Sequence, residues 1–126
     1  MKITKREKVL LYMLLENDVH RYLLANTYGR LDGSEKAERH LKISEIVFSF
    51  IFQKKYMYGR DHDFIMRIHN SLAEILTDRL DEVIGFPIKE ESWNIDYFDY
   101  CKRFVNVIID NMDKIKDNAN NPQYDW

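Results

Sequence analysis

A chain of 126 residues with 45% hydrophobic and 32% charged side chains is long enough to bury a core as one domain. The one cysteine, Cys101, excludes an internal disulfide, and no run approaches the roughly 18 apolar residues that a membrane-spanning helix needs. The basic start and the apolar run after it resemble a secretory signal, but no small-residue cleavage site follows. We therefore expect a cytoplasmic protein.

The two halves of the chain differ in charge. Residues 1–60 hold 12 Lys and Arg against 7 Asp and Glu, whereas residues 61–126 hold 7 against 14. The resulting net charges, +5 and −7, either neutralise each other where the halves pack together or mark a charged interaction surface.

Four long segments without helix breakers predict four helices, over residues 4–28, 34–58, 61–84 and 92–118. Each begins at or next to a residue that favours the N-cap position: Thr4, Ser34, Asp61 and Ser92. Glu7 occupies the capping-box position after Thr4. A glycine follows each of the first three segments, at positions 29, 59 and 85, and glycine favours the left-handed residue that ends a helix.

Hydrophobic residues recur at steps of three and four in every segment, as on one face of a helix. The first segment is richer in them between Val9 and Leu24, which suggests burial on more than one side. These patterns predict an all-α, up-down-up-down four-helix bundle with short loops marked by glycine. We place a single helical domain at residues 1–117 and a flexible polar tail at residues 118–126.

Four hydrophobic residues fall outside the main apolar stripes: Phe50, Phe52, Val107 and Ile109. They are either ordinary surface residues or part of a dimer face. Together with the broad apolar face of the first segment, they predict a homodimer.

The stretch KKYMYGRDHD at residues 54–63 joins the second segment to the third. Lysines suit the end of a helix and aspartates the start of the next, which accounts for most of the stretch. In an up-down bundle this junction returns to the level at which the first helix begins. The resulting basic end gathers the residues that we predict to bind a partner: Lys5, Arg6, Lys8, Lys54, Lys55, Tyr56, Tyr58 and Arg60. Basic and aromatic side chains together suit nucleic acid or an acidic protein surface.

The opposite, acidic end holds candidate metal ligands: Glu35, Glu38, Asp78 and Asp81. All-α nucleotide pyrophosphatases of the MazG type hold Mg²⁺ with acidic pairs in a similar general arrangement. Glu35 and Glu38 form the first acidic pair of this chain. The second pair is Glu74 and Asp78, and its spacing departs from that of the family. Acidic residues are also favoured in the first turn of a helix, where Glu35 and Glu38 lie.

The histidines and the cysteine form no recognised catalytic pattern. His62-Asp63 matches the pair of HD-type phosphohydrolases, but it lies in the first turn of a helix, where capping explains it. No Glu-x-x-His di-iron motif is present, and a hydrogen-bonded core histidine accounts for His69. Cys101 lies on the apolar stripe of the last segment and is predicted to be a core residue.

We therefore expect a non-enzymatic helical protein, without a cofactor, that binds a protein partner through charged surfaces. Regulators, inhibitors and adaptors of phage or accessory-gene type are often such chains. Two alternatives stay open: nucleic-acid binding through the basic end, and metal-dependent nucleotide hydrolysis through the acidic end. No membrane association is expected.

Overall fold

The computed structural model describes residues 2–28, 33–78 and 97–124, without the side chains of residues 24–28, 33–36, 76–78, 97, 98 and 100. Its described regular structure is all helical, as the sequence predicts. The described elements are α1 (Lys5–Tyr28), α2 (Gly33–Phe52), α3 (His62–Asp78), α5 (Tyr97–Asp110), α6 (Met112–Ala119) and the 3₁₀ helix η2 (Pro122–Tyr124).

The start of α1 has the predicted capping box. Thr4 Oγ1 accepts a hydrogen bond from the Glu7 N–H at 3.1 Å, and Glu7 Oε1 accepts one from the Thr4 N–H at 3.3 Å. The pair satisfies two backbone N–H groups that have no partner inside the helix. From there α1 continues to Tyr28, the end of the first predicted segment.

The second predicted helix differs at both ends. It begins at Gly33, so Ser34 lies inside it, and it ends at Phe52 rather than at residue 58. Gln53 has a positive φ of 56°, the left-handed conformation that commonly follows a helix. Gly59, which we expected to end this helix, has a φ of 88° and lies in the connection to α3 instead.

The last predicted helix is divided in two at Asn111. The Asn111 side chain donates to the Val107 carbonyl at 2.8 Å, although the Asn111 backbone N–H also bonds that carbonyl at 3.1 Å. Such side-chain bonds to a carbonyl one turn earlier compete with the backbone ladder and bend helices. The bend separates α5 from α6, so that α5 contacts α1 while α6 contacts α3.

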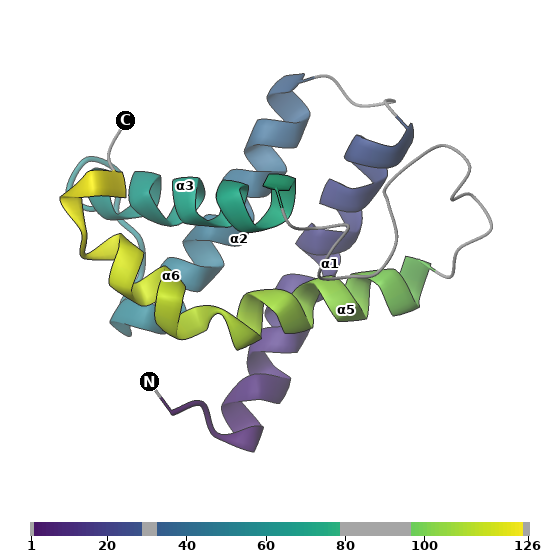
Figure 1. The fold of residues 1–126 in the computed structure, drawn as a ribbon, viewed down its shortest axis with the longest axis horizontal. Coiled ribbons are helices and arrows are strands. Elements are labelled where there is room, and N and C mark those ends of the chain that lie inside the picture. Colours follow the sequence, from purple (N-terminus) through teal and green to yellow (C-terminus); the bar gives the residue numbers. More distant parts are fainter. Residues whose placement is uncertain (1, 29–32, 79–96, 125–126) are drawn as a thin grey trace.

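One pair of helices runs side by side, and other helices cross this pair. Figure 1 shows α1 and α2 as an antiparallel pair, with α3 and α5 lying across them. The described residues thus form five α-helices in a crossed arrangement, whereas the sequence predicts four in an up-down-up-down bundle. Ser92, the predicted cap of the last helix, lies outside the described residues.

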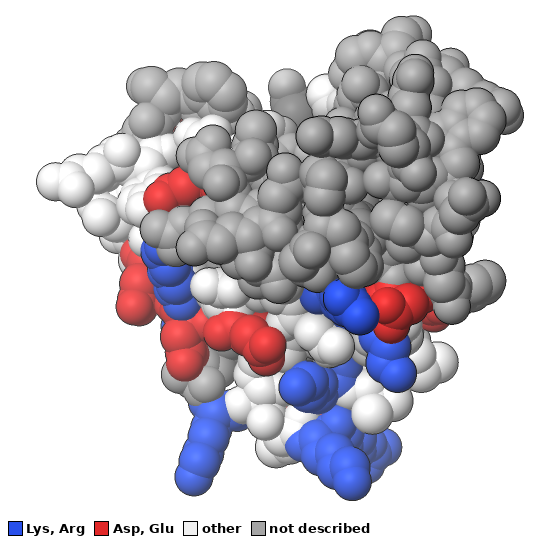
Figure 2. Space-filling model, turned by 45° about the vertical axis from the view of Figure 1, so that its right-hand side comes forward, with Lys and Arg blue, Asp and Glu red and all other residues white. Residues whose placement is uncertain are grey.

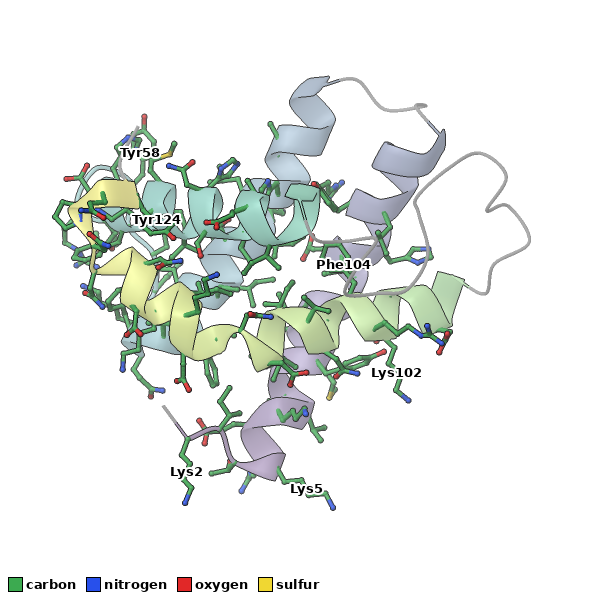
Figure 3. The ribbon with its side chains drawn as sticks, in the orientation of Figure 1. Lys2, Lys5, Tyr58, Lys102, Phe104 and Tyr124 are labelled. Carbon is green, nitrogen blue, oxygen red and sulfur yellow. The ribbon has the colours of Figure 1, made fainter. Side chains whose placement is uncertain are left out.

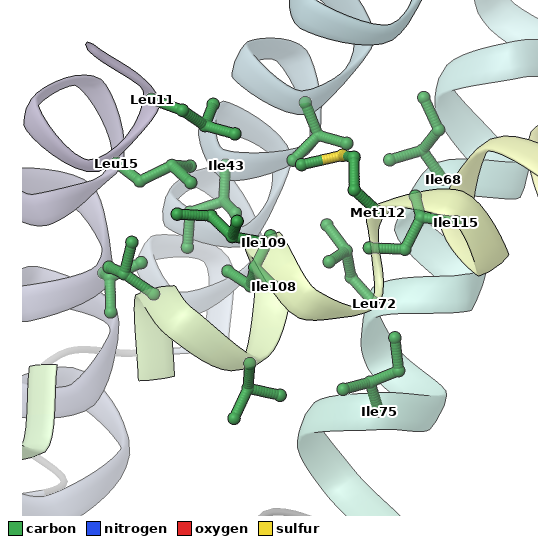
Figure 4. Close-up of a cluster of buried hydrophobic side chains, with 14 of the residues drawn as sticks. Leu11, Leu15, Ile43, Ile68, Leu72, Ile75, Ile108, Ile109, Met112 and Ile115 are labelled. Atoms are coloured by element: carbon green, nitrogen blue, oxygen red, sulfur yellow. The ribbon is translucent and has the colours of Figure 1, made fainter. Parts of the chain in front are cut away.

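A single cluster of buried apolar side chains joins these helices (Figure 4). It extends from Leu11 and Leu15 of α1 to Leu72 of α3 through residues of α2, α5 and α6. Val107 and Ile109, with 7% and 5% of their surface exposed, belong to this core. Phe50 and Phe52 are half-buried and pack against it. All four of these spare hydrophobic residues therefore contact the core, although Phe50 and Phe52 stay partly exposed, and the homodimer stays a prediction.

The described residues of the predicted tail, 118–124, are packed against α3. Asn118 is buried and donates to Ser71 Oγ at 2.9 Å. Asn70 donates to the Tyr124 carbonyl at 2.7 Å, and the Tyr124 hydroxyl lies 3.3 Å from Glu74 Oε2. The sequence predicts a flexible tail here, whereas these bonds fix η2 to α3.

Candidate partner-binding surface

The connection between α2 and α3 is organised by one buried carboxylate. Only 2% of the Asp61 side chain is exposed. Its Oδ2 accepts a hydrogen bond from the Met57 N–H at 2.9 Å, and the Met57 carbonyl accepts one from the Asp61 N–H at 3.1 Å. Asp61 thus closes the turn that contains Gly59, and it precedes the first residue of α3 as predicted.

Two of the predicted binding residues contact this carboxylate. The Arg60 guanidinium lies 2.9 Å from Asp61 Oδ2, and the Lys54 ammonium lies 3.5 Å from Oδ1. The hydrogen bond from Arg60 is the main cause that lowers the pKa of Asp61 to about 2. Lys54 and Arg60 therefore stabilise the turn, and the single carboxylate of Asp61 offsets one of their two positive charges.

Lys5, Arg6 and Lys8 lie exposed at the beginning of α1. The Lys8 ammonium lies 4.0 Å from Asp110 Oδ1 of α5, with both side chains at least half exposed. Figure 2 shows Lys and Arg side chains gathered at the end of the molecule where α1 begins, with uncharged surface between them. Basic side chains therefore gather where α1 begins, which is one part of the predicted basic end.

An apolar surface lies on α1 just beyond these basic residues. Val9, Leu10, Met13 and Leu14 are 55%, 52%, 66% and 60% exposed. They form the apolar centre of what we call the outer face of α1, which points away from the core residues Leu11, Leu15 and Val19. Large apolar side chains that adjoin one another on the surface are typical of interaction sites.

A groove of about 460 Å³ lies beside this face, between α1 and α2. Its lining consists of Leu14, Glu45, Ile46, Ser49, Phe50, Lys55 and Tyr56. Burial raises the pKa of Tyr56, whose ring packs edge-on against Phe48 with 5.7 Å between centroids. The groove therefore places two of the predicted binding residues, Lys55 and Tyr56, next to the apolar face of α1.

Tyr58 does not join them. It is 89% exposed, and Figure 3 places it on the side of the molecule away from Lys2 and Lys5. The eight predicted residues thus fall into three groups: Lys5, Arg6 and Lys8 at the start of α1, Lys55 and Tyr56 in the groove, and the turn residues Lys54, Tyr58 and Arg60.

A second hollow, of about 350 Å³, lies on the other side of the outer face, between α1 and α5. Met13, Glu16, Asn17, His20 and Cys101 line it. Cys101 is buried and donates to the Glu16 carbonyl at 3.4 Å, and burial raises the pKa of its thiol to about 11. The thiol is thus protonated at neutral pH, in agreement with the predicted core role.

Two histidine rings stack on each other, one of them buried and the other half-buried. His40 of α2 stacks on His69 of α3 with 4.0 Å between ring centroids, and Tyr22 of α1 lies 5.5 Å from His40. Burial is the main cause that lowers the pKa of both imidazoles, that of His40 to about 3. Among the described residues no three His, Cys, Asp or Glu side chains come together as metal ligands. Of the acidic end, Glu38 is exposed, whereas Asp81 and the side chains of Glu35 and Asp78 lie outside the described residues.

The apolar part of the outer face was not among the predicted binding residues. Hydrophobic residues surround α1 on all sides, so its sequence pattern does not distinguish the face that packs in the core from the face in solvent. Hydrophobic residues beyond one core stripe were the available signal. They predict burial on more than one side, whereas Val9, Leu10, Met13 and Leu14 are each more than half exposed.

None of the described helices is both long and apolar enough to cross a membrane. The fold and the surface define an all-helical domain with an exposed apolar helix face bordered by basic residues. No protein-family model matches the chain, and no curated protein or solved structure matches it.

Proposed function

We propose that this chain is a non-enzymatic protein-interaction domain that binds a partner protein through the outer face of α1. The observation that carries the proposal is the exposure of Val9, Leu10, Met13 and Leu14 next to Lys5 and Arg6. Hydrophobic stabilisation of about 25 cal/mol per Å² makes covering such side chains favourable. A regulator, inhibitor or adaptor would use the face in this way.

Nucleic acid is the second candidate, because the start of α1 is basic. Phosphate contacts need Lys and Arg, but they gain nothing from Met13 or Leu14, which are the most exposed of the four apolar side chains of the face. Duplex nucleic acid therefore leaves the apolar part of the surface unexplained. A protein partner accounts for both parts, since interfaces combine an apolar centre with a polar rim.

Photo-crosslinking in the native host tests the proposal. A photoreactive phenylalanine replaces Met13 in one variant and the exposed Tyr58, which Figure 3 places away from the start of α1, in a control variant. We expect a discrete protein adduct from position 13 that disappears when Leu14→Glu is added. Adducts that are sensitive to nuclease would favour nucleic acid. Adducts from position 58 alone would contradict the choice of face.

A further inference from the structure

We propose that the partner docks as an acidic amphipathic helix lying in the groove between α1 and α2, an inference that rests on the function proposed above. The groove runs beside an antiparallel helix pair and is lined mainly by apolar side chains, among them Leu14, Ile46 and Phe50. Ile46 and Phe50 are one helical turn apart on α2. A helix that enters such a groove inserts side chains at the same one-turn spacing.

The charges around the groove favour an acidic occupant. Arg6 and Arg21 lie exposed on α1, and Lys55 lies at the groove itself. None of these three cations forms an ion pair with a carboxylate among the described residues. The groove lining itself holds one cation, Lys55, and one half-buried carboxylate, Glu45, so the excess of positive charge comes from Arg6 and Arg21 on the adjoining outer face of α1.

The same charges disfavour a second copy of the chain on the outer face. Arg6, Leu10, Met13, Asn17 and Arg21 follow one another at steps of three and four, so they share this face. The two arginines are about 22 Å apart along the axis, with the apolar residues midway between them. An antiparallel two-fold pairing centred on those residues would bring Arg6 of each copy opposite Arg21 of the other, and like charges repel.

A designed peptide serves as the probe. It has 16 residues, with Leu at every third and fourth position on one face and Glu elsewhere, and a fluorescent label at one end. One control peptide has the same composition in an order that destroys the apolar face, and another replaces each Glu with Lys. Fluorescence anisotropy at low and at moderate salt measures binding of each peptide to the whole chain.

Variants of the chain locate the peptide. We expect Leu14→Glu to weaken binding of the acidic peptide about tenfold at both salt concentrations, because it places a charge in the groove. The double change Arg6→Glu and Arg21→Glu should weaken binding several-fold at low salt and less at moderate salt, since the exposed charges are screened. Tyr58→Glu, which alters a side chain of the α2–α3 turn that does not line the groove, should bind like the wild type.

The inference would be overturned if the reordered peptide or the lysine peptide bound as tightly as the acidic peptide. It would also be overturned if Leu14→Glu left binding of the acidic peptide unchanged. Tighter binding of anionic vesicles or duplex DNA than of the acidic peptide, lost in the same variant, would assign the face to lipid or nucleic acid. A dimer that dissociates in Leu14→Glu, seen by light scattering, would assign it to a second copy. If the peptide fails but position 13 still crosslinks to a protein, the proposed function stands and only the acidic helix is wrong.

Discussion

Replacing His40 tests the largest pH effect that the structure implies. The ring is 7% exposed, and its Nε2 is buried without a hydrogen-bond partner. Burial, with a smaller contribution from His69, lowers the pKa from 6.5 to about 3. The folded protein therefore keeps this imidazole neutral at pH 5, whereas the unfolded chain protonates it.

The sign and size of the effect follow from linkage. Because the pKa of His40 is lower in the folded state, the contribution of His40 to the free energy of unfolding is fully present above pH 6.5. It is lost as the pH falls toward 3. Between pH 7 and pH 5 the unfolded state takes up most of one proton and the folded state takes up none. The free energy of unfolding should then fall by about 2 kcal/mol from His40 alone.

Urea unfolding followed by circular dichroism at pH 7 and pH 5 measures this fall. His40→Phe keeps an aromatic ring beside Tyr22 and cannot take up a proton, so its stability should decline much less over the same range. His69, whose pKa burial also lowers, accounts for a smaller remaining decline. Replacing the exposed His62 with Gln should leave the wild-type decline in place. A wild type with equal stability at both pH values, or a His40→Phe variant with the full decline, would refute the reasoning.

Three further changes test the packing, each by urea unfolding at pH 7. Asn118→Ala leaves the buried Ser71 hydroxyl without its donor and should cost about 1–3 kcal/mol, whereas no loss would mean that water replaces the amide. Leu15→Ala should cost about 2–5 kcal/mol because the side chain is fully buried, while the adjacent, exposed Leu14→Ala should change stability by about 0.5 kcal/mol or less. Gly59→Ala should cost about 1–2 kcal/mol, because φ is 88° at this position and alanine is strained there. No atom lies within 4 Å of the added methyl group, so a steric clash does not contribute, and an unchanged stability would show that the turn relaxes.

The sequence predicts local features of the helices well. The capping box at Thr4 is confirmed, because Ser or Thr followed three residues later by Glu forms bonds that need no tertiary partner. The end of α2 could not be predicted in the same way, since Gln53 takes a conformation that glycine usually supplies. The bend at Asn111 depends on one side-chain bond to the preceding turn, and asparagine within a helix often points to solvent instead.

The binding surface was only partly predictable, for a physical reason. Charged residues can be identified directly from the sequence, so the basic start of α1 could be predicted. Whether an apolar residue such as Met13 is covered depends on which helices pack against it, and that depends on crossing angles that the pattern does not contain. The contribution of Lys54 and Arg60 to the turn could not be predicted, because the sequence indicates Asp61 only as a helix cap and does not show that it is their common partner.

The attachment of η2 and α6 to α3 has a consequence for synthesis of the protein. The hydrogen bonds that hold Asn70, Ser71 and Glu74 join residues 47 to 54 positions apart. At roughly 5–20 residues per second, α3 waits about 2–11 seconds on the ribosome before its partner segment is made. During that interval the side of α3 that α6 will cover stays open to water, with Ile68 and Leu72 on its apolar stripe. The nascent chain thus exposes a hydrophobic surface for a time, at the stage when chaperones bind nascent chains. That surface is covered only when residues 118–124 have left the exit tunnel.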